Sequence, residues 1–135
     1  MMVFVDTSAL YSFLDADDDS HGVVERAWRE LLEADRVLCT TNYVLTETTV
    51  LLQSRLGLEA VSVLAQEVAP LLQVEWITEE QHEAALIAVL SANRRDLSLV
   101  DCVSFAAMRR LALRQALTVD QHFRDQGFEV LPPQT

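Results

Sequence analysis

The fold is decided by a run of four apolar residues that leads into an acid and two hydroxyl residues, Met2-Val3-Phe4-Val5-Asp6-Thr7-Ser8. A short continuous apolar run is typical of a strand buried on both faces, as in a parallel sheet covered by helices. Thr7 or Ser8 is then expected to cap a helix over residues 9–14. Asp6 is therefore predicted at the carboxyl end of a central strand, where open α/β sheets bind their ligands. The alternative is that Asp6 is only a loop or capping residue.

A negative net charge and the absence of lysine limit the chemistry of the chain. The 135 residues include 21 acids and 10 bases, a formal net charge of -11, and every base is an arginine. This balance is the reverse of that of a generic nucleic-acid binder, and it favours bound cations or a basic partner protein. The absence of lysine excludes P-loop and Schiff-base chemistry. It also excludes a haloacid-dehalogenase-like phosphatase, which needs a lysine and an aspartate where Ser8 stands.

Length and hydrophobicity indicate a single folded unit. With half of its residues hydrophobic, the chain can bury a real core, so we expect one domain over residues 1–135. Cys39 and Cys102 stand on separate apolar stretches and are expected to be buried, reduced thiols. The sequence shows no signal peptide and no apolar run of membrane-spanning length. These features predict a cytoplasmic protein that does not bind a membrane.

Strand and helix patterns alternate along the whole chain. Further strands are expected at residues 37–40, 73–77, 116–120 and 128–131. Helices are expected to open at residues 20–21 and 98, and to occupy residues 42–55, 58–72 and 78–93. Such an alternation predicts an α/β fold in which right-handed crossovers join the strands of a parallel sheet.

Asp101 lies in the middle of an apolar helix stripe. Its spacing from Ser98 is that of a capping box, in which an acid is often purely structural. At 100° per residue, however, the residues within about 40° of it are all apolar: Leu97, Phe105, Met108 and Ala112. A capping acid would lie on the polar face instead. Because a buried carboxylate needs a cation or several donors, we favour a functional role for Asp101.

Two further acids are candidates for the same site. Glu47 lies on the shoulder of the apolar stripe of helix 42–55, where it either needs a cation or reaches out to water. Asp120 ends the strand at 116–120, as Asp6 ends the first strand. The four carboxylates could thus meet at one edge of the sheet, and clustered like charges are costly unless a cation neutralises them. Oxygen ligands without a cysteine or histidine set suit Mg²⁺ or Mn²⁺.

The three histidines are not expected to be ligands. His21 and His82 lie at helix starts and are expected at the surface. His122 neighbours Asp120 and could touch a phosphate, although a turn-stabilising or exposed position is the preferred interpretation. The acidic run at residues 15–19 is expected to be a solvated loop that caps the next helix.

Four segments of the chain resemble, in their order and spacing, the PIN-domain ribonucleases, specifically the small VapC-type toxins of toxin–antitoxin pairs. The segments are Val3-Phe4-Val5-Asp6-Thr7-Ser8-Ala9-Leu10, Asn42-Tyr43-Val44-Leu45-Thr46-Glu47, Leu97-Ser98-Leu99-Val100-Asp101-Cys102 and Leu117-Thr118-Val119-Asp120-Gln121-His122-Phe123. No single segment is specific, but the four together are, and they cover essentially the whole chain. All four acids stand where the family has them. The absence of lysine and the acidic balance are departures, so charge does not indicate which surface grips RNA.

The resemblance implies a three-layer α/β/α sandwich and a metal-dependent endoribonuclease. Asp6 and Asp101 would be the inner ligands of Mg²⁺ or Mn²⁺, and Glu47 and Asp120 would complete the site directly or through water. The metal would activate water for in-line attack on a phosphodiester. The hydroxyl groups placed to orient these carboxylates are those of Thr7, Ser8, Ser98 and Thr118. The arginines that could hold flanking phosphates are Arg94, Arg95, Arg109, Arg110 and Arg124.

The resemblance also implies partners. An antitoxin could neutralise the enzyme by inserting an arginine among the acids, and contact with DNA would be made by the antitoxin's own domain. A homodimer is implied as well. The substrate would be an RNA, and tRNA, rRNA and mRNA are all compatible with the sequence. A competing hypothesis is a non-catalytic PIN-like binding module whose acidic pocket docks a basic partner protein, although docking alone would not require Asp101 in the centre of a stripe.

Overall fold

Five short parallel strands form the centre of the computed structural model, which describes residues 1–133. Their order across the sheet is β3-β2-β1-β4-β5. The strands are β1 (Met2–Val5), β2 (Val37–Thr41), β3 (Leu72–Glu75), β4 (Gln115–Leu117) and β5 (Glu129–Leu131). The predicted buried first strand is confirmed, because Val3, Phe4 and Val5 are fully buried in the middle of the sheet.

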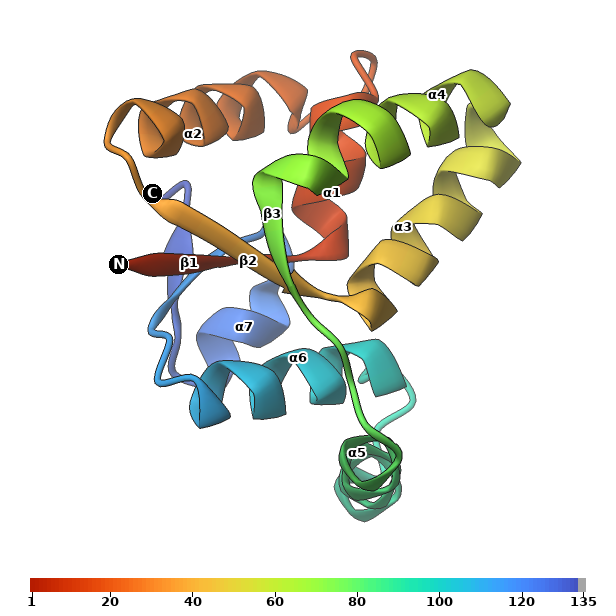
Figure 1. Cartoon of the computed structure of the whole chain (residues 1–135). Helices are drawn as coiled ribbons and strands as arrows, with labels where there is room; N and C mark the ends of the chain where they lie inside the picture. Colours follow the sequence, from red (N-terminus) through yellow and green to blue (C-terminus); the bar gives the residue numbers. More distant parts are fainter. Residues whose placement is uncertain (134–135) are drawn as a thin grey trace.

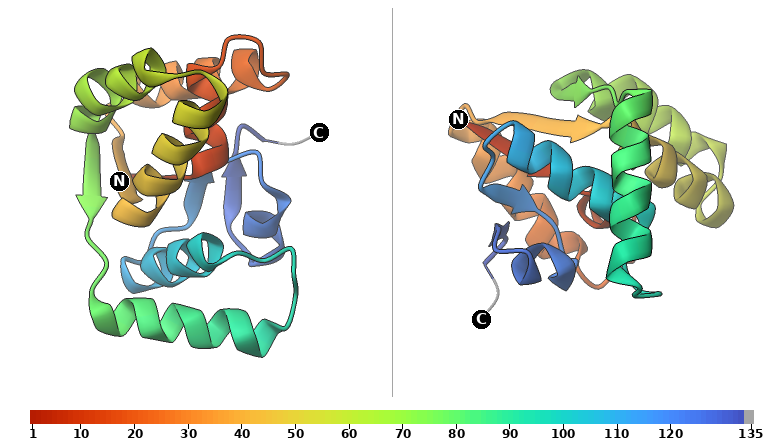
Figure 2. Two further views of the ribbon diagram at one scale, coloured as in Figure 1. Left: turned by 90° about the vertical axis from the view of Figure 1, so that its right-hand side faces the viewer. Right: turned by 90° about the horizontal axis from the view of Figure 1, so that it is seen from below.

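Helices cover both faces of this sheet (Figure 1). On one side lie α1 (Thr7–Leu14), α2 (His21–Glu33), α3 (Asn42–Arg55) and α4 (Leu58–Val63). On the other lie α5 (Glu79–Ala92), α6 (Leu99–Arg110) and α7 (Gln121–Asp125). Figure 2 shows α5 crossing the outer side of α6, and Ala85 is its one buried residue. The predicted α/β/α sandwich is therefore confirmed.

The direction of the sheet order reverses beside β1. From β1 the chain proceeds through β2 to β3 on one side, and then returns across the sheet to β4 on the other side of β1. The carboxyl ends of β1 and β4 are adjacent, since Val5 is in register with Leu117 and the Asp6 N–H donates to the Leu117 carbonyl over 3.1 Å. Such a reversal point is where open α/β sheets form their ligand crevice.

Some element boundaries differ from the sequence-based predictions. The first helix begins at Thr7 because Asp6, and not Thr7 or Ser8, is its N-cap. The helix expected over residues 58–72 is divided into α4, a π turn (Leu64–Val68) and a 3₁₀ turn (Ala69–Leu71) that contains Pro70, which has no N–H for a helical bond. The third strand ends at Glu75, and Trp76 is 71% exposed.

Three further expectations about side chains are only partly correct. His21 is half-buried and its Nδ1 lies 2.8 Å from the Ser12 carbonyl, and His82 is half-buried with a hydrogen bond to the Tyr43 hydroxyl. Ala112 lies beyond the end of α6, at a φ of 56°, and is exposed.

Cys39 and Cys102 are buried free thiols, as expected. Within residues 1–133, no helix is long and apolar enough to cross a membrane.

An aromatic cluster holds the last helix against the sheet. Phe123 of α7 is fully buried, with ring centroids 4.9 Å from Phe105 of α6, 6.2 Å from Phe4 of β1 and 6.4 Å from Phe128. This packing fixes α7, and with it the residues on either side of Phe123, next to the carboxyl end of β1.

We expect Phe123→Ala to lower the free energy of unfolding by about 3–5 kcal/mol, because a buried phenyl group is removed from a site bounded by three other rings. Urea denaturation followed by circular dichroism measures the loss. Phe123→Leu, which keeps most of the volume, should lose less. A loss below about 1 kcal/mol for the alanine variant would show that α7 is not held by this cluster.

Candidate metal centre

Asp6 is a buried carboxylate with two roles. It caps α1, since its Oδ2 accepts the Ser8 N–H at 3.4 Å. The same oxygen accepts the hydroxyls of Ser8 at 2.9 Å and Thr118 at 3.0 Å. Asp6 is only 3% exposed. Burial raises the pKa of Asp6 to about 6, with further increases from Asp101 and Asp120, against the lowering effect of the two hydroxyls.

The two hydroxyl residues tie the ends of β1 and β4 together. Ser8 Oγ lies 3.0 Å from Thr118 Oγ1 and accepts the Val119 N–H at 3.0 Å. Thr118 Oγ1 in turn accepts the Asp120 N–H at 2.9 Å. The orientation of the Asp6 carboxylate and the course of the backbone at Asp120 are therefore set by the same pair of side chains.

Asp101 enters the site from α6. It is the third residue of that helix, and the capping box is complete: Asp101 Oδ2 accepts the Ser98 N–H at 3.2 Å, and Ser98 Oγ accepts the Asp101 N–H at 3.0 Å. The residue is only 8% exposed. Burial raises the pKa of Asp101, as does the nearby Asp120, while the bond from Ser98 lowers it. The acid therefore caps the helix and also lies inward.

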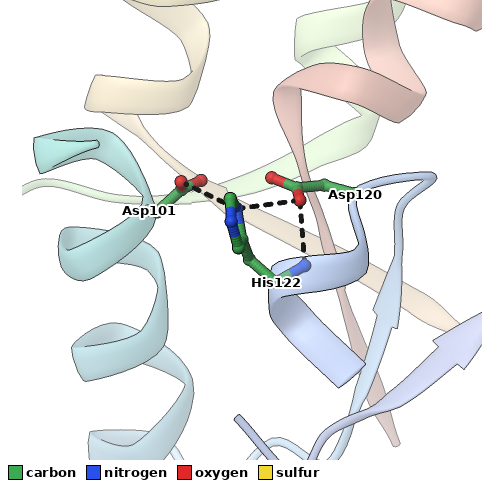
Figure 3. A group of neighbouring side chains, drawn as sticks. All are labelled: Asp101, Asp120 and His122. Atoms are coloured by element: carbon green, nitrogen blue, oxygen red, sulfur yellow. Dashed lines mark hydrogen bonds and ion pairs between the residues drawn. The ribbon is translucent and has the colours of Figure 1, made fainter. Parts of the chain in front are cut away.

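Asp120 and His122 complete a cluster with Asp101 at the start of α7. One ligand atom from each of the three side chains lies within 4.8 Å of the others. Figure 3 shows the His122 ring between the two carboxylates, with Nδ1 3.1 Å from Asp120 Oδ1 and 3.6 Å from Asp101 Oδ2. Asp120 Oδ1 also accepts the His122 backbone N–H at 2.9 Å.

The other ring nitrogen of His122 contacts a fourth acid, Asp96, which lies in the loop between α5 and α6. His122 Nε2 is 3.2 Å from Asp96 Oδ2, and Arg94 holds the same carboxylate at 2.9 and 3.3 Å. Hydrogen bonds from Arg94 and His122 lower the pKa of Asp96 to about 2. Burial lowers the pKa of His122, but the bond to Asp96 and the charges of Asp120 and Asp101 outweigh burial and raise it.

The remaining residues predicted at the site have fewer contacts. Glu47, on α3, is half-buried, and within residues 1–133 its carboxylate makes no hydrogen bond or ion pair with another side chain. The hydroxyl of Thr7 is buried without a hydrogen-bond partner in this part of the chain. Ser98 holds Asp101 through both halves of the capping box: its backbone N–H donates to the Asp101 carboxylate, and its hydroxyl accepts the Asp101 N–H.

The predicted phosphate-binding arginines are all exposed, but two of them have partners. Arg94 is paired with Asp96. Arg109 donates to Gln126 at 2.8 Å and stacks over Phe128. Arg95, Arg110 and Arg124 make no ion pair among the described residues, so their guanidinium groups are the ones available for a phosphate.

The donor set of this site fits a divalent cation. Burial and the neighbouring acids raise the pKa of Asp6 and of Asp101, so holding both as carboxylates is costly without a cation. His122 Nδ1 is a buried polar atom without a hydrogen-bond partner. Oxygen ligands with one nitrogen would hold Mg²⁺ or Mn²⁺. The cluster can therefore bind a metal.

His122 and Asp96 are the members of this arrangement that were not predicted from the sequence. The signal for His122 was its position two residues after Asp120, on a turn that Phe123 anchors in the core. Asp96 carries no such signal, because it lies in a loop and reaches the site only through tertiary structure.

The comparisons with known proteins agree with one another. The family model described as PIN domain matches residues 3–129. A curated relative, the 23S rRNA-specific endonuclease VapC20 of Mycobacterium tuberculosis, is 34% identical over 134 residues, which are 98% of this chain and 100% of that protein. The crystal structure of VapC20, titled a Sarcin-Ricin loop cleaving toxin, matches with a TM-score of 0.82 and 33% identity over 93% of this chain and 95% of that one.

More distant solved structures share the fold. FitAcB from Neisseria gonorrhoeae has a TM-score of 0.69 at 15% identity and covers 98% of both chains. VapBC2 from Rickettsia felis, bound to a promoter DNA fragment, has a TM-score of 0.68 at 12% identity over 96% of this chain and 97% of that one. The family match over nearly the whole chain and the close likeness to VapC20 lead to one conclusion: this chain belongs to the PIN domain family, a nuclease fold.

Proposed function

We propose that this protein is a metal-dependent endoribonuclease that acts as the toxin of a toxin–antitoxin pair. The observation that carries the proposal is the meeting of Asp101, Asp120 and His122 within 4.8 Å, beside the buried Asp6, at the reversal point of a parallel sheet. The similarity to VapC20, an endonuclease and toxin by name, supports it. We take residues 1–135 to act as one PIN-like domain.

In this proposal the acids bind the metal and the hydroxyls orient the acids. Asp6 and Asp101 are the inner ligands, and Asp120 and Glu47 complete the site directly or through water. Ser8 and Thr118 fix Asp6, since both donate to its Oδ2. A bound Mg²⁺ or Mn²⁺ supplies an activated water and neutralises charge on the scissile phosphate. Without a cation, the acids repel RNA, so metal binding precedes substrate binding.

The substrate that we propose is 23S rRNA at the sarcin–ricin loop. The support is VapC20, a 23S rRNA-specific endonuclease that cleaves the sarcin–ricin loop and that aligns with this chain over its full length. Arg95, Arg110 and Arg124 are exposed and are our candidates for the flanking phosphates, together with Arg94 and Arg109 once their present partners release them. Guanidinium groups suit this role because they bind phosphate through two parallel hydrogen bonds.

We further propose a cognate antitoxin that inserts a basic side chain among the acids and displaces the metal. VapBC2 of Rickettsia felis, a distant neighbour, is bound to a DNA fragment from its promoter, and we infer a comparable assembly for this chain, in which the antitoxin makes the DNA contact. The chain is then a homodimer in the cytoplasm, and DNA is contacted only through the antitoxin.

Cleavage of ribosomes by the purified protein tests the function. With Mg²⁺ or Mn²⁺ we expect a single cut in 23S rRNA that gives two discrete fragments, mapped by primer extension to the sarcin–ricin loop, and no cut with EDTA or with Asp101→Asn. Asp101→Asn keeps the shape of a residue that is 8% exposed, so loss of the cut reports loss of the carboxylate.

Growth inhibition in cells separates the two functional hypotheses. If Asp101→Asn still inhibits growth as strongly as the unchanged protein, the nuclease is wrong, and a binding module that docks a basic partner is favoured. Discrete cleavage at another RNA would keep the nuclease and replace only the substrate.

A further inference from the structure

We propose that His122 is a direct nitrogen ligand of the metal, held in position by Asp96, and that this ligand makes the site prefer Mn²⁺ to Mg²⁺. The inference rests on the proposed nuclease function and names a further residue and the ion of the same site. It is carried by the arrangement of both ring nitrogens of His122.

The first step concerns Nδ1. This atom is buried and has no hydrogen-bond partner, although carboxylate oxygens of Asp120 and Asp101 lie only 3.1 and 3.6 Å away. Figure 3 shows the ring between the two carboxylates, with dashed lines for the ion pairs of Nδ1 with Asp120 and Asp101. A buried ring nitrogen that lies between two carboxylates, and that makes no hydrogen bond within residues 1–133, is placed where a cation bound by those carboxylates would meet it.

The second step concerns Nε2, which fixes the tautomer. Nε2 lies 3.2 Å from Asp96 Oδ2. A carboxylate held by the Arg94 guanidinium is ionised and can only accept, so Nε2 must carry the proton and donate. In the neutral ring Nδ1 is then the unprotonated nitrogen, as coordination requires. A carboxylate that orients a ligating histidine through its other nitrogen is a recurring partner in metal sites.

The third step concerns rigidity. His122 is followed directly by Phe123, which is fully buried, and its own backbone N–H donates to Asp120. The backbone of the histidine is therefore anchored to the core on one side and to another ligand on the other. A side chain held in this way loses little further freedom when it coordinates an ion.

The choice of ion follows from the nitrogen. Mg²⁺ prefers oxygen ligands and waters, whereas imidazole suits the divalent transition metals. With carboxylates alone and no imidazole, the site would hold either ion. With His122 as a ligand, Mn²⁺ is favoured.

Electron spin-echo spectroscopy of the Mn²⁺-loaded protein tests the bond directly, because a coordinated nitrogen-14 modulates the echo. We expect this modulation in the unchanged protein, its alteration when the histidines are labelled with nitrogen-15, and its loss in His122→Asn. Asparagine is the sharpest replacement, since its side-chain amide reaches the position of Nδ1 and can supply an oxygen there. His82→Asn is the matched control and should leave the modulation unchanged, because the His82 ring is hydrogen-bonded to the Tyr43 hydroxyl and is not a member of the metal cluster.

Calorimetric titration with each ion tests the preference. We expect the ratio of the Mg²⁺ to the Mn²⁺ dissociation constant to fall by about tenfold in His122→Asn, and Asp96→Asn to weaken Mn²⁺ binding by about tenfold while the nitrogen modulation remains. Urea denaturation of both variants establishes that they are folded.

The outcomes distinguish this inference from the proposed function. Mn²⁺ binding and RNA cleavage without nitrogen modulation would overturn the role of His122 and leave the nuclease intact. A protein that binds neither ion and cleaves nothing would overturn both. An unchanged ion ratio in His122→Asn would also overturn the inference.

Discussion

Replacing Asp6 by asparagine is expected to reduce RNA cleavage by more than about a hundredfold and, at the same time, to stabilise the metal-free protein at pH 7. The loss of cleavage follows from removal of a proposed inner ligand, since even the outer partners of a metal are worth about 10–100-fold. The gain in stability follows from burial: ionising a carboxyl group whose pKa is raised from 3.8 to about 6 costs about 3 kcal/mol. Asparagine removes that cost and keeps an oxygen for Ser8 and Thr118.

Two measurements on the same variant check this prediction: the rate of fragment formation with Mn²⁺, and urea denaturation in EDTA. Asp19→Asn is the matched control, because it makes the same chemical change on an exposed loop residue and should alter neither quantity. A variant that loses both activity and stability would mean that Asp6 acts as a structural residue. A variant that keeps activity would remove Asp6 from the metal site.

The stability of the metal-free protein is expected to fall between pH 5 and pH 7.5, and a divalent cation is expected to reverse this trend. Asp6 has a folded pKa near 6, above its unfolded value of 3.8, so its contribution is complete below about pH 4 and is lost as the pH rises through 6. The raised pKa values of Asp101 and His122 act in the same direction. Asp96, with a pKa of about 2, does not titrate in this range.

Denaturation at the two pH values, with EDTA or with Mn²⁺, measures the effect. At a Mn²⁺ concentration of about a hundred times the dissociation constant, the ion should add about 2.7 kcal/mol. This addition should shrink below pH 6, because protons compete for the same ligands. In Asp6→Asn the pH dependence in EDTA should be smaller. Greater stability at pH 7.5 than at pH 5 without metal would contradict the prediction.

The fold was predictable because its signals are local. The apolar run before Asp6 and the capping box at Ser98 depend on residues that are neighbours in sequence, and the structure confirms both. The division of residues 58–71 was missed because Pro70 and a π turn change the hydrogen bonding without disturbing the apolar pattern. The end of β3 was missed for a related reason: Trp76 continues the apolar pattern, but it lies outside the sheet and exposed.

The site was predictable in part. The inward position of Asp101 followed from its helix stripe. The proximity of Asp6 and Asp120 followed from two predicted strands that end in acids, although β4 ends at Leu117 and Asp120 is the N-cap of α7. The orientation of His122 could not be predicted, because it depends on Asp96, which lies 26 residues earlier in a loop. The bond from the Ser98 N–H to the Asp101 carboxylate is part of the capping box that the spacing of the two residues predicts.

During synthesis, Asp6 leaves the ribosome long before Asp120. The hydrogen bond between Thr118 and Asp6 spans 112 residues, and β4, the neighbour of β1 on that side, begins only at Gln115. At about 5–20 residues per second, the pocket remains open for most of synthesis. Fragments that end before residue 118 hold Asp6 and Asp101 but have nothing to close the crevice around them. The metal-binding arrangement is therefore incomplete in an interrupted chain, and we expect RNA cleavage only once β4 and α7 are in place.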